Sequence, residues 1–241
     1  MKIHLVTFSN KSWYDDTDYY GPSLKRLTES ALNNGVNEVH SYNEENLPVS
    51  EDILNYMLEN RRSGFGFYSW KPIVILDTLQ KLPEGDVVLY HDVGRPNYNY
   101  EIKKDVNPLI RTIVNEYNGV GVVAGEWLHR NWCKRHCFQA MGCDYEEYWG
   151  INQLTANWNI WQKNSIVLEI VNLWKNWCLT PSVVDTKSFV DTNIELDNFS
   201  EHRWDQAILT NIIRKYELNN IGIKPLPLLS RVWEKNINNW L

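Results

Sequence analysis

Two kinds of apolar pattern alternate along the chain, short runs typical of strands and longer segments with helical spacing. The short runs predict strands at residues 2–9, 36–42, 86–92, 119–127, 156–163 and 221–227. The longer segments place apolar residues on one face and predict helices at residues 23–35, 50–62, 71–82, 107–117, 131–142, 165–178 and 201–216. Residues 180–200 are polar and predict a loop. The alternation of strands and helices indicates α/β architecture.

The strand predicted at residues 86–92 is a continuous apolar run that ends on His91 and Asp92. Such a run is typical of a strand buried on both faces, where an unpaired carboxylate is costly. In open α/β sheets, ligands bind outside the carboxyl ends of the strands. Asp92 is therefore the leading site candidate. The alternative is that Asp92 only caps a turn with Gly94.

The composition restricts the class of partner and of compartment. The chain has 241 residues, 43% of them hydrophobic, and no linker interrupts it, which favours one domain over residues 1–241. A formal net charge of −6 argues against a nucleic-acid partner. The first residues lack the apolar core of a signal peptide, and no apolar run reaches the length of a transmembrane segment. We therefore expect a cytoplasmic protein, with a peripheral place at the inner face of a membrane left open.

Aromatic residues and cysteines add two further observations. Twelve Trp and thirteen Tyr supply flat faces that stack on sugars and bases, or else form an aromatic core. Four cysteines are too few for a disulfide scaffold in a chain of this length. His129, Cys133, His136 and Cys137, with Cys143 nearby, fall close to one helix face, so zinc or an iron–sulfur cluster is conceivable. Their spacing matches no paired CxxC site, and buried structural cysteines are the commoner case.

The segment "SGFGFYSWKP", residues 63–72, is rich in glycine and aromatic residues and follows Arg61 and Arg62. Glycines allow a backbone to approach a phosphate closely, and these arginines with Lys71 would neutralise its charge. The spacing is that of neither a Walker loop nor a dinucleotide fingerprint. The alternative is an aromatic hinge between two helices, with the arginines in solvent.

The segment "HRWDQ", residues 202–206, gathers ionisable and amide side chains at a predicted helix start. Asp205 near a helix N-terminus is favoured electrostatically, which by itself explains its presence. The functional alternative makes Asp205 a catalytic carboxylate or an acceptor contact, and His202 a phosphate or metal contact.

Taken in order, these segments resemble a group of small bacterial and viral glycosyltransferases with the GT-A fold. The matching stretches are "SGFGFYSWKP", "EGDVVLYHDVG", "NWCKRHCF", "GINQLTANWNIWQKN" and "EHRWDQAIL", and the resemblance extends from Lys2 to about Tyr216. It implies a single domain with a mixed, mostly parallel central sheet flanked by helices. Residues 1–100 would form the nucleotide-sugar-binding half and residues 101–230 the acceptor-side half, followed by a C-terminal tail at residues 231–241.

The resemblance also implies roles for particular residues. The donor would contact Thr7, Phe8, Arg62, Lys71, Asp92 and Gly94, and the sugar or acceptor would contact Gln153, Trp204 and Gln206. The catalytic carboxylates would be Asp92 and Asp205. A divalent cation, Mn²⁺ or Mg²⁺, would be bound by Asp92 and His202.

The implied function is transfer of a sugar from a nucleotide-sugar donor to a hydroxyl of a glycan, lipid-linked or other acceptor, in surface-glycan or polysaccharide assembly. Two departures from the family pattern matter. The usual Asp-x-Asp is reduced to Asp92-Val93-Gly94, so one metal ligand is missing, and the arginine position before the first glycine of the box is Ser63, with Arg62 adjacent.

Two alternatives remain open at this point. A sugar nucleotidyltransferase would carry a glycine-rich basic segment just after the first strand, and "TFSNKSWYDD" lacks one. The missing second Asp is consistent with a degenerate, non-catalytic module that binds a nucleotide or a carbohydrate.

Overall fold

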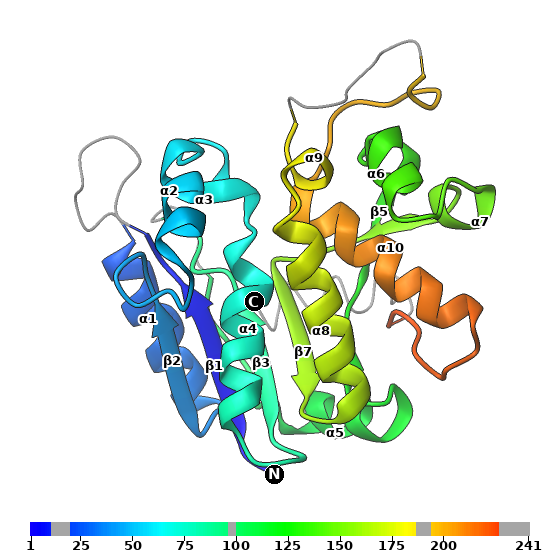
Figure 1. Ribbon diagram of the computed structural model, residues 1–241. Helices are drawn as coiled ribbons and strands as arrows, with labels where there is room; N and C mark the ends of the chain where they lie inside the picture. Colours follow the sequence, from blue (N-terminus) through cyan, green and yellow to red (C-terminus); the bar gives the residue numbers. More distant parts are fainter. Residues whose placement is uncertain (11–19, 96–99, 187–193, 227–241) are drawn as a thin grey trace.

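The computed structural model describes residues 1–10, 20–95, 100–186 and 194–226 and centres on a five-stranded sheet in the order β2-β1-β3-β7-β4 (Figure 1). The strands are β1 (Ile3–Phe8), β2 (Glu38–Tyr42), β3 (Val87–His91), β4 (Val120–Gly121) and β7 (Trp158–Gln162). Strands β2, β1 and β3 pair in parallel, whereas β7 runs antiparallel to both β3 and β4. The expected α/β domain with a mixed sheet flanked by helices is thus confirmed.

The helices cover both faces of this sheet (Figure 1). They are α1 (Gly21–Asn33), α2 (Glu51–Glu59), α3 (Gly64–Phe67), α4 (Trp70–Lys81), α5 (Asn107–Glu116), α6 (Arg135–Ala140), α7 (Glu146–Trp149), α8 (Ser165–Cys178), α9 (Pro181–Val184) and α10 (Trp204–Leu218), with a 3₁₀ turn η1 (His129–Asn131). Helices α4, α8 and α10 contribute to the larger apolar cluster, and α1 and α5 to the other. Helix α4 packs on α8, and α8 packs on α10.

The central strands are buried on both faces, as their uninterrupted apolar runs predict. In β3, Val88 and Tyr90 face the α4 side, whereas Val87 and Leu89 face the α5 side. All five residues of β3 are buried. This burial fixes the direction of the strand and therefore the place where Asp92 leaves the sheet.

The predicted strand at residues 119–127 is divided in the structure. Residues 120–121 form β4, but β5 (Ala124–Leu128) joins a separate two-stranded sheet with β6 (Asn152–Leu154). The reason is that the intervening carbonyls bind other segments: Val122 accepts from the amide of Leu226, and Val123 from the amide of Thr155. The strand predicted at residues 221–227 is reduced to an isolated bridge between Leu226 and Val123, with residue 227 outside the described part.

The helix predicted at residues 131–142 is shorter than expected, because it is replaced by η1 and α6. The carbonyls of Asn131 and Trp132 accept hydrogen bonds from the segment at residues 200–203 instead of from a helix. The predicted loop at residues 180–200 contains the short helix α9. The tail at residues 231–241 lies outside the described residues. Within the described part, no helix has the length and apolar character needed to cross a membrane.

Candidate functional site

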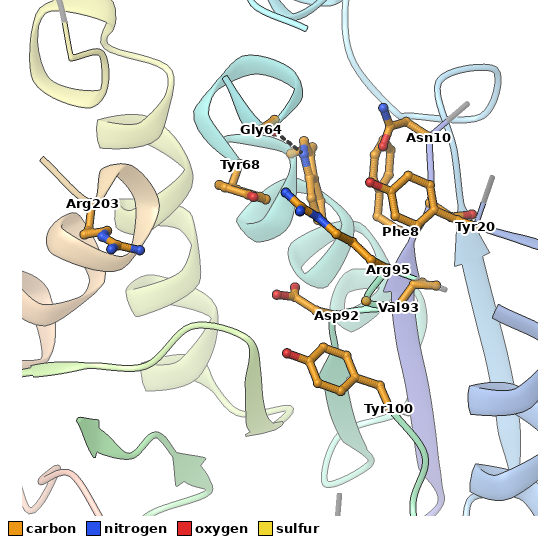
Figure 2. A pocket seen from close by; sticks show the side chains of 13 residues that line it. Phe8, Asn10, Tyr20, Gly64, Tyr68, Asp92, Val93, Arg95, Tyr100 and Arg203 are labelled. Atoms are coloured by element: carbon orange, nitrogen blue, oxygen red, sulfur yellow. Dashed lines mark hydrogen bonds between the residues drawn. The ribbon is translucent and has the colours of Figure 1, made fainter. Parts of the chain in front are cut away.

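A cavity of about 440 Å³ opens at the carboxyl ends of β1 and β3. Figure 2 shows Asp92 and Arg95 pointing into the same space, with Arg203 on the far side from Phe8 and Tyr20. The lining residues are Phe8, Ser9, Asn10, Tyr20, Gly64, Tyr68, Trp70, Asp92, Val93, Gly94, Arg95, Tyr100 and Arg203. Carboxyl ends of parallel strands are where open α/β sheets bind ligands, so this cavity is the candidate site.

Asp92 stands at the mouth of this cavity, directly after β3. Its Oδ1 accepts a hydrogen bond from the Tyr90 hydroxyl and lies 3.5 Å from the Nζ of Lys71. The side chain is 28% exposed, so a ligand in the cavity can reach it while Tyr90 and Lys71 hold its Oδ1 in place. The position of Asp92 is consistent with the expectation that this carboxylate faces a ligand.

Lys71 lies beneath the cavity and does not line it. Its ammonium donates to the carbonyl of Ala156 at 2.9 Å and forms ion pairs with Asp205 at 3.2 Å and with Asp92 at 3.5 Å. Burial by itself would lower the pKa of Lys71, but the two carboxylates raise that pKa above its ordinary value. Lys71 therefore remains charged and joins the two carboxylates instead of meeting a diphosphate directly.

Asp205 lies in the first turn of α10 and is 3% exposed. Burial raises its pKa to about 6, against the opposite effect of the Lys71 ammonium. A carboxyl group that titrates near neutral pH has the acidity expected of a general acid or base. Asp205 is not among the cavity-lining residues, and it connects to the cavity through Lys71 and Asp92.

The glycine and aromatic box forms a tight left-handed turn beside the cavity. Residues 64–68 all have positive φ angles, between 51° and 75°. Gly64 lines the cavity, and its carbonyl accepts a hydrogen bond from the Trp70 indole at 3.2 Å (Figure 2). The turn fixes the rings of Tyr68 and Trp70 on the cavity wall, with Phe8 stacked on Trp70 at a centroid distance of 4.2 Å. The box is thus a connection between helices, as the alternative interpretation expected, and it also forms part of the cavity wall. A contact between the box and a phosphate stays a prediction.

The cationic side chains at the cavity differ from those expected. Arg62 is exposed and does not line the cavity, whereas Arg95 and Arg203 do. Arg203 also lies over the ring of Trp132 at 4.5 Å and pairs with Glu201 at 2.7 Å. The sequence did contain a signal for Arg95, which follows Gly94 directly in the loop after β3.

The other residues expected on the donor or acceptor side are divided between the cavity and the core. Phe8 and Gly94 line the cavity. Thr7 is fully buried, where its hydroxyl donates to the carbonyl of His91 at 2.8 Å, and this bond ties β1 to β3. Trp204 does not line the cavity but packs on Tyr68, with ring centroids 5.5 Å apart.

Gln153, which is fully buried, and Gln206, which is partly exposed, belong to one polar network and do not line the cavity. Gln206 donates to the side-chain oxygen of Gln153 at 2.8 Å, and Gln153 donates to the carbonyl of Trp132 at 3.1 Å. The network continues through His129, whose Nε2 bonds to Asn211 at 3.0 Å. These contacts attach α10 to β6 and to the η1 turn, and they account for both glutamines without a sugar.

His202 does not fit the expected metal contact, because both of its ring nitrogens are engaged. Nε2 donates to the carbonyl of Val183 at 2.9 Å, and Nδ1 accepts from the amide of Lys134 at 3.3 Å. Burial lowers the pKa of His202 to about 3, so the ring is neutral. Its role is to hold the segment before α10 against α9.

The candidate metal cluster on residues 129–143 is also not supported by the structure. Cys133 and Cys137 are buried, and the Asn211 amide points at both sulfurs from 3.9 and 3.7 Å. Burial raises the pKa of Cys133 well above its usual range, which keeps the thiol protonated. Among the described residues, the one group of three potential ligands that converges lies elsewhere, at His4, Glu38 and His40.

The site as a whole combines an open carboxylate, a buried ion-paired carboxylate, two arginines and an aromatic wall. This set can bind an anionic ligand with a planar group and can exchange a proton near neutral pH. Comparison of the chain with protein-family models and with curated proteins finds no match. The resemblance drawn from the ordered motifs therefore stays a prediction.

Proposed function

We propose that this protein is a glycosyltransferase of GT-A type, which moves a sugar from a nucleotide-sugar donor to an acceptor hydroxyl on a glycan or lipid-linked substrate. The observation that carries the proposal is the pair Asp92 and Asp205, joined by Lys71 beside an aromatic cavity at the carboxyl ends of β1 and β3. The placement suits a nucleotide and its sugar, because the aromatic wall offers stacking faces and the strand ends offer polar groups.

The charges of the site match the charges that sugar transfer develops. Cleavage of the bond to a nucleoside diphosphate places negative charge on the leaving phosphate and positive charge on the sugar ring. Arg95 and Arg203 supply the cations at the cavity wall. Asp92 supplies the anion for the sugar, and the protonation state of Asp205 sets the net charge of the Lys71–Asp205 pair beside Asp92.

The residues present do not fit the expected Mn²⁺ or Mg²⁺ site well. These ions prefer several oxygen ligands. Among the described residues that line the cavity, Asp92 is the one carboxylate, and its Oδ1 already contacts Tyr90 and Lys71. His202 is committed to backbone groups. We therefore assign the neutralisation of the leaving diphosphate to the arginines and not to a metal ion.

A thermal-shift screen with UDP-, GDP- and dTDP-sugars, each with Mg²⁺ or with EDTA, tests the donor site. We expect one nucleotide class to raise the melting temperature to a similar degree in both conditions, because a ligand that binds only the native state stabilises it. Arg95→Ala should reduce that shift. A screen in which none of these donors shifts the melting temperature would contradict the proposal.

Release of nucleoside diphosphate from the donor found in the screen then measures turnover. We expect Asp92→Asn to lower turnover by roughly 10²–10⁴-fold, as is typical of lost carboxylate participation. The matched control is Asp197→Asn, the same chemical change at an exposed position, which should retain the wild-type rate. Equal turnover in Asp92→Asn and wild type would show that the site is elsewhere.

A second candidate function is a non-catalytic module that binds a nucleotide or a carbohydrate. It is favoured by one observation, that both carboxylates are already ion-paired to Lys71 and that Asp205 does not line the cavity. That function predicts a thermal shift with a nucleotide-sugar but no release of diphosphate by the wild type.

A further inference from the structure

A second polar cluster lies near the start of β1, at the end of the sheet remote from the cavity. His4 lies near the start of β1, and Glu38 and His40 lie on β2. The parallel register pairs His4 with Glu38 and Val6 with His40, so the three polar side chains share one face of the sheet. His4 of β1 pairs with Val88 of β3. Val88 precedes Asp92 by four residues, so His4 lies level with a point roughly 13 Å along β3 from Asp92.

The ligand atoms of this cluster converge at distances typical of a metal site. Nδ1 of His4 lies 3.1 Å from Nε2 of His40 and 3.8 Å from Oε2 of Glu38, and all three atoms fall within 4.8 Å of one another. Nitrogen ligands at the usual bond length of zinc, in a tetrahedral arrangement, are about 3.3 Å apart. Lys2 holds the other Glu38 oxygen at 2.8 Å, which turns Oε2 toward the histidines.

A buried carboxylate stands behind His4. Nε2 of His4 lies 3.6 Å from Oδ2 of Asp86, and Asp86 is itself fixed by a 2.7 Å hydrogen bond from the backbone amide of Lys2. His4 is 1% exposed, and within the described residues its Nε2 makes no hydrogen bond. Metal-binding histidines usually direct their second ring N–H to a carboxylate, which fixes the tautomer and leaves the first nitrogen free for the metal. Asp86 is placed for that role.

We propose that His4, His40 and Glu38 bind a zinc ion, with Asp86 as the positioning residue for His4. Two imidazoles and one carboxylate suit zinc and exclude magnesium or calcium, which prefer oxygen ligands only. Three protein ligands leave a fourth position for water, and the half-exposed Glu38 gives the ion access from solvent. The bound ion would connect the edge strand β2 to β1 at the end of the sheet remote from the cavity.

The competing explanation is a single proton shared between the two imidazoles at 3.1 Å. The two explanations differ in whether the protein binds a zinc ion at this cluster. Titration with Zn²⁺ by calorimetry, and with Co²⁺ by absorption spectroscopy, should give one ion per chain and a tetrahedral cobalt spectrum without a thiolate charge-transfer band. The missing thiolate band matters because the chain also contains four free cysteines.

The zinc affinity of variants at the ligand residues tests where the ion binds. We expect His40→Gln and Glu38→Gln to weaken zinc binding by roughly 100-fold or more, and Asp86→Asn to weaken it by roughly 10–100-fold with an altered cobalt spectrum. His136→Gln and Asp92→Asn, at a distant histidine and at the cavity, should bind zinc as the wild type does. His40 and Glu38 are not fully buried, so their variants keep the test decisive if a His4 variant fails to fold.

Three results would overturn the proposal: no zinc bound by the wild type, unchanged affinity in His40→Gln, or a cobalt spectrum dominated by thiolate ligation. The outcome is independent of sugar transfer, since zinc binding is measured without a donor and donor binding is measured in EDTA.

Discussion

At the scale of single residues, Lys71 is the group on which the candidate site depends. A buried ammonium at the N-terminus of α4 is opposed both by desolvation and by the helix dipole. Two carboxylates offset these costs, and they reach Lys71 from the end of β3 and the start of α10. Because Lys71 stays charged, a change in the protonation of Asp205 alters the net charge of the Lys71–Asp205 pair that lies beside Asp92.

The raised pKa of Asp205, about 6, predicts a pH-dependent difference between the wild type and Asp205→Asn. The unfolded Asp releases its proton near pH 4, so the folded protein binds the proton more tightly between pH 4 and 6. The contribution of Asp205 to stability is therefore complete below pH 4 and is lost as pH rises through about 6. The free energy of unfolding of the wild type, minus that of the variant, should fall by about 2 kcal/mol from pH 4 to 6 and then level off above the folded pKa.

Urea denaturation of both proteins at half-unit pH steps measures this difference. The subtraction removes the effects of the buried histidines, which both proteins share. A difference that stays constant across the pH range would show that Asp205 titrates normally.

At the scale of elements, the left-handed turn at residues 64–68 determines the wall of the cavity. Non-glycine residues in this conformation each cost roughly 1–2 kcal/mol, and the turn contains three of them, Phe65, Phe67 and Tyr68. Phe65 and Phe67 are buried, which offsets part of that cost. Backbone strain of this kind is concentrated at functional sites, and here it orients Tyr68 and Trp70 toward the same cavity.

Gly64→Ala tests how tightly this turn is packed. Gly64 has a φ of 64°, and a Cβ there would lie 2.5 Å from the ring of Tyr68, which is itself held by Trp204. Gly142 is a matched control, because its φ is 67° and, within the described part of the chain, no atom beyond the adjacent residues lies within 4 Å of a Cβ there. We expect Gly142→Ala to lower the free energy of unfolding by about 1 kcal/mol, because of its positive φ alone. Gly64→Ala should lower it by that amount and by about 1–3 kcal/mol more, because of the clash with Tyr68.

The two glycine variants are compared by their urea midpoints under identical conditions. Equal losses would mean that the ring of Tyr68 moves aside freely and that the turn does not fix it.

At the scale of the whole molecule, the segment around α10 is attached to the rest of the protein through two buried neutral histidines. His129 bonds to Asn211 on α10, and His202 bonds to Val183 on α9 just before α10 begins. Burial lowers the pKa of His129 to about 4 and that of His202 to about 3. Protonation of either ring would place a charge in the core, so the contacts that attach α10 and the segment before it depend on pH.

These two histidines predict a loss of stability in acid. Their folded pKa values lie below the unfolded value of about 6.5, so the stability they contribute is present above pH 6.5 and is lost as pH falls. Between pH 6.5 and 4.5 the expected loss is about 2 kcal/mol for each histidine, partly offset by the opposite effect of Asp205. His202→Gln should flatten the slope of unfolding free energy against pH, even though it lowers stability at pH 7. An unchanged slope in that variant would contradict the burial of a neutral His202.

Sequence reasoning succeeded where the signal is local. The apolar run at residues 87–90 predicted a strand buried on both faces, and the helix spacing of residues 165–178 matched α8. The same run placed Asp92 at a strand end, where the structure has a cavity. The prediction of one strand at residues 119–127 was wrong. The local pattern favoured a single strand, but pairing with the distant residues 155 and 226 divided it.

The sequence by itself determined the α/β class, the course of β3 and the position of Asp92, since burial periodicity and strand ends are properties of neighbouring residues. Only the tertiary structure decided which charges meet. It brought Lys71 between Asp92 and Asp205, put Arg95 instead of Arg62 on the cavity wall, and committed His202 to the core. These contacts join residues far apart in the chain, and they depend on how packed elements exclude water and pair charges, which the spacing of residues along one segment does not encode.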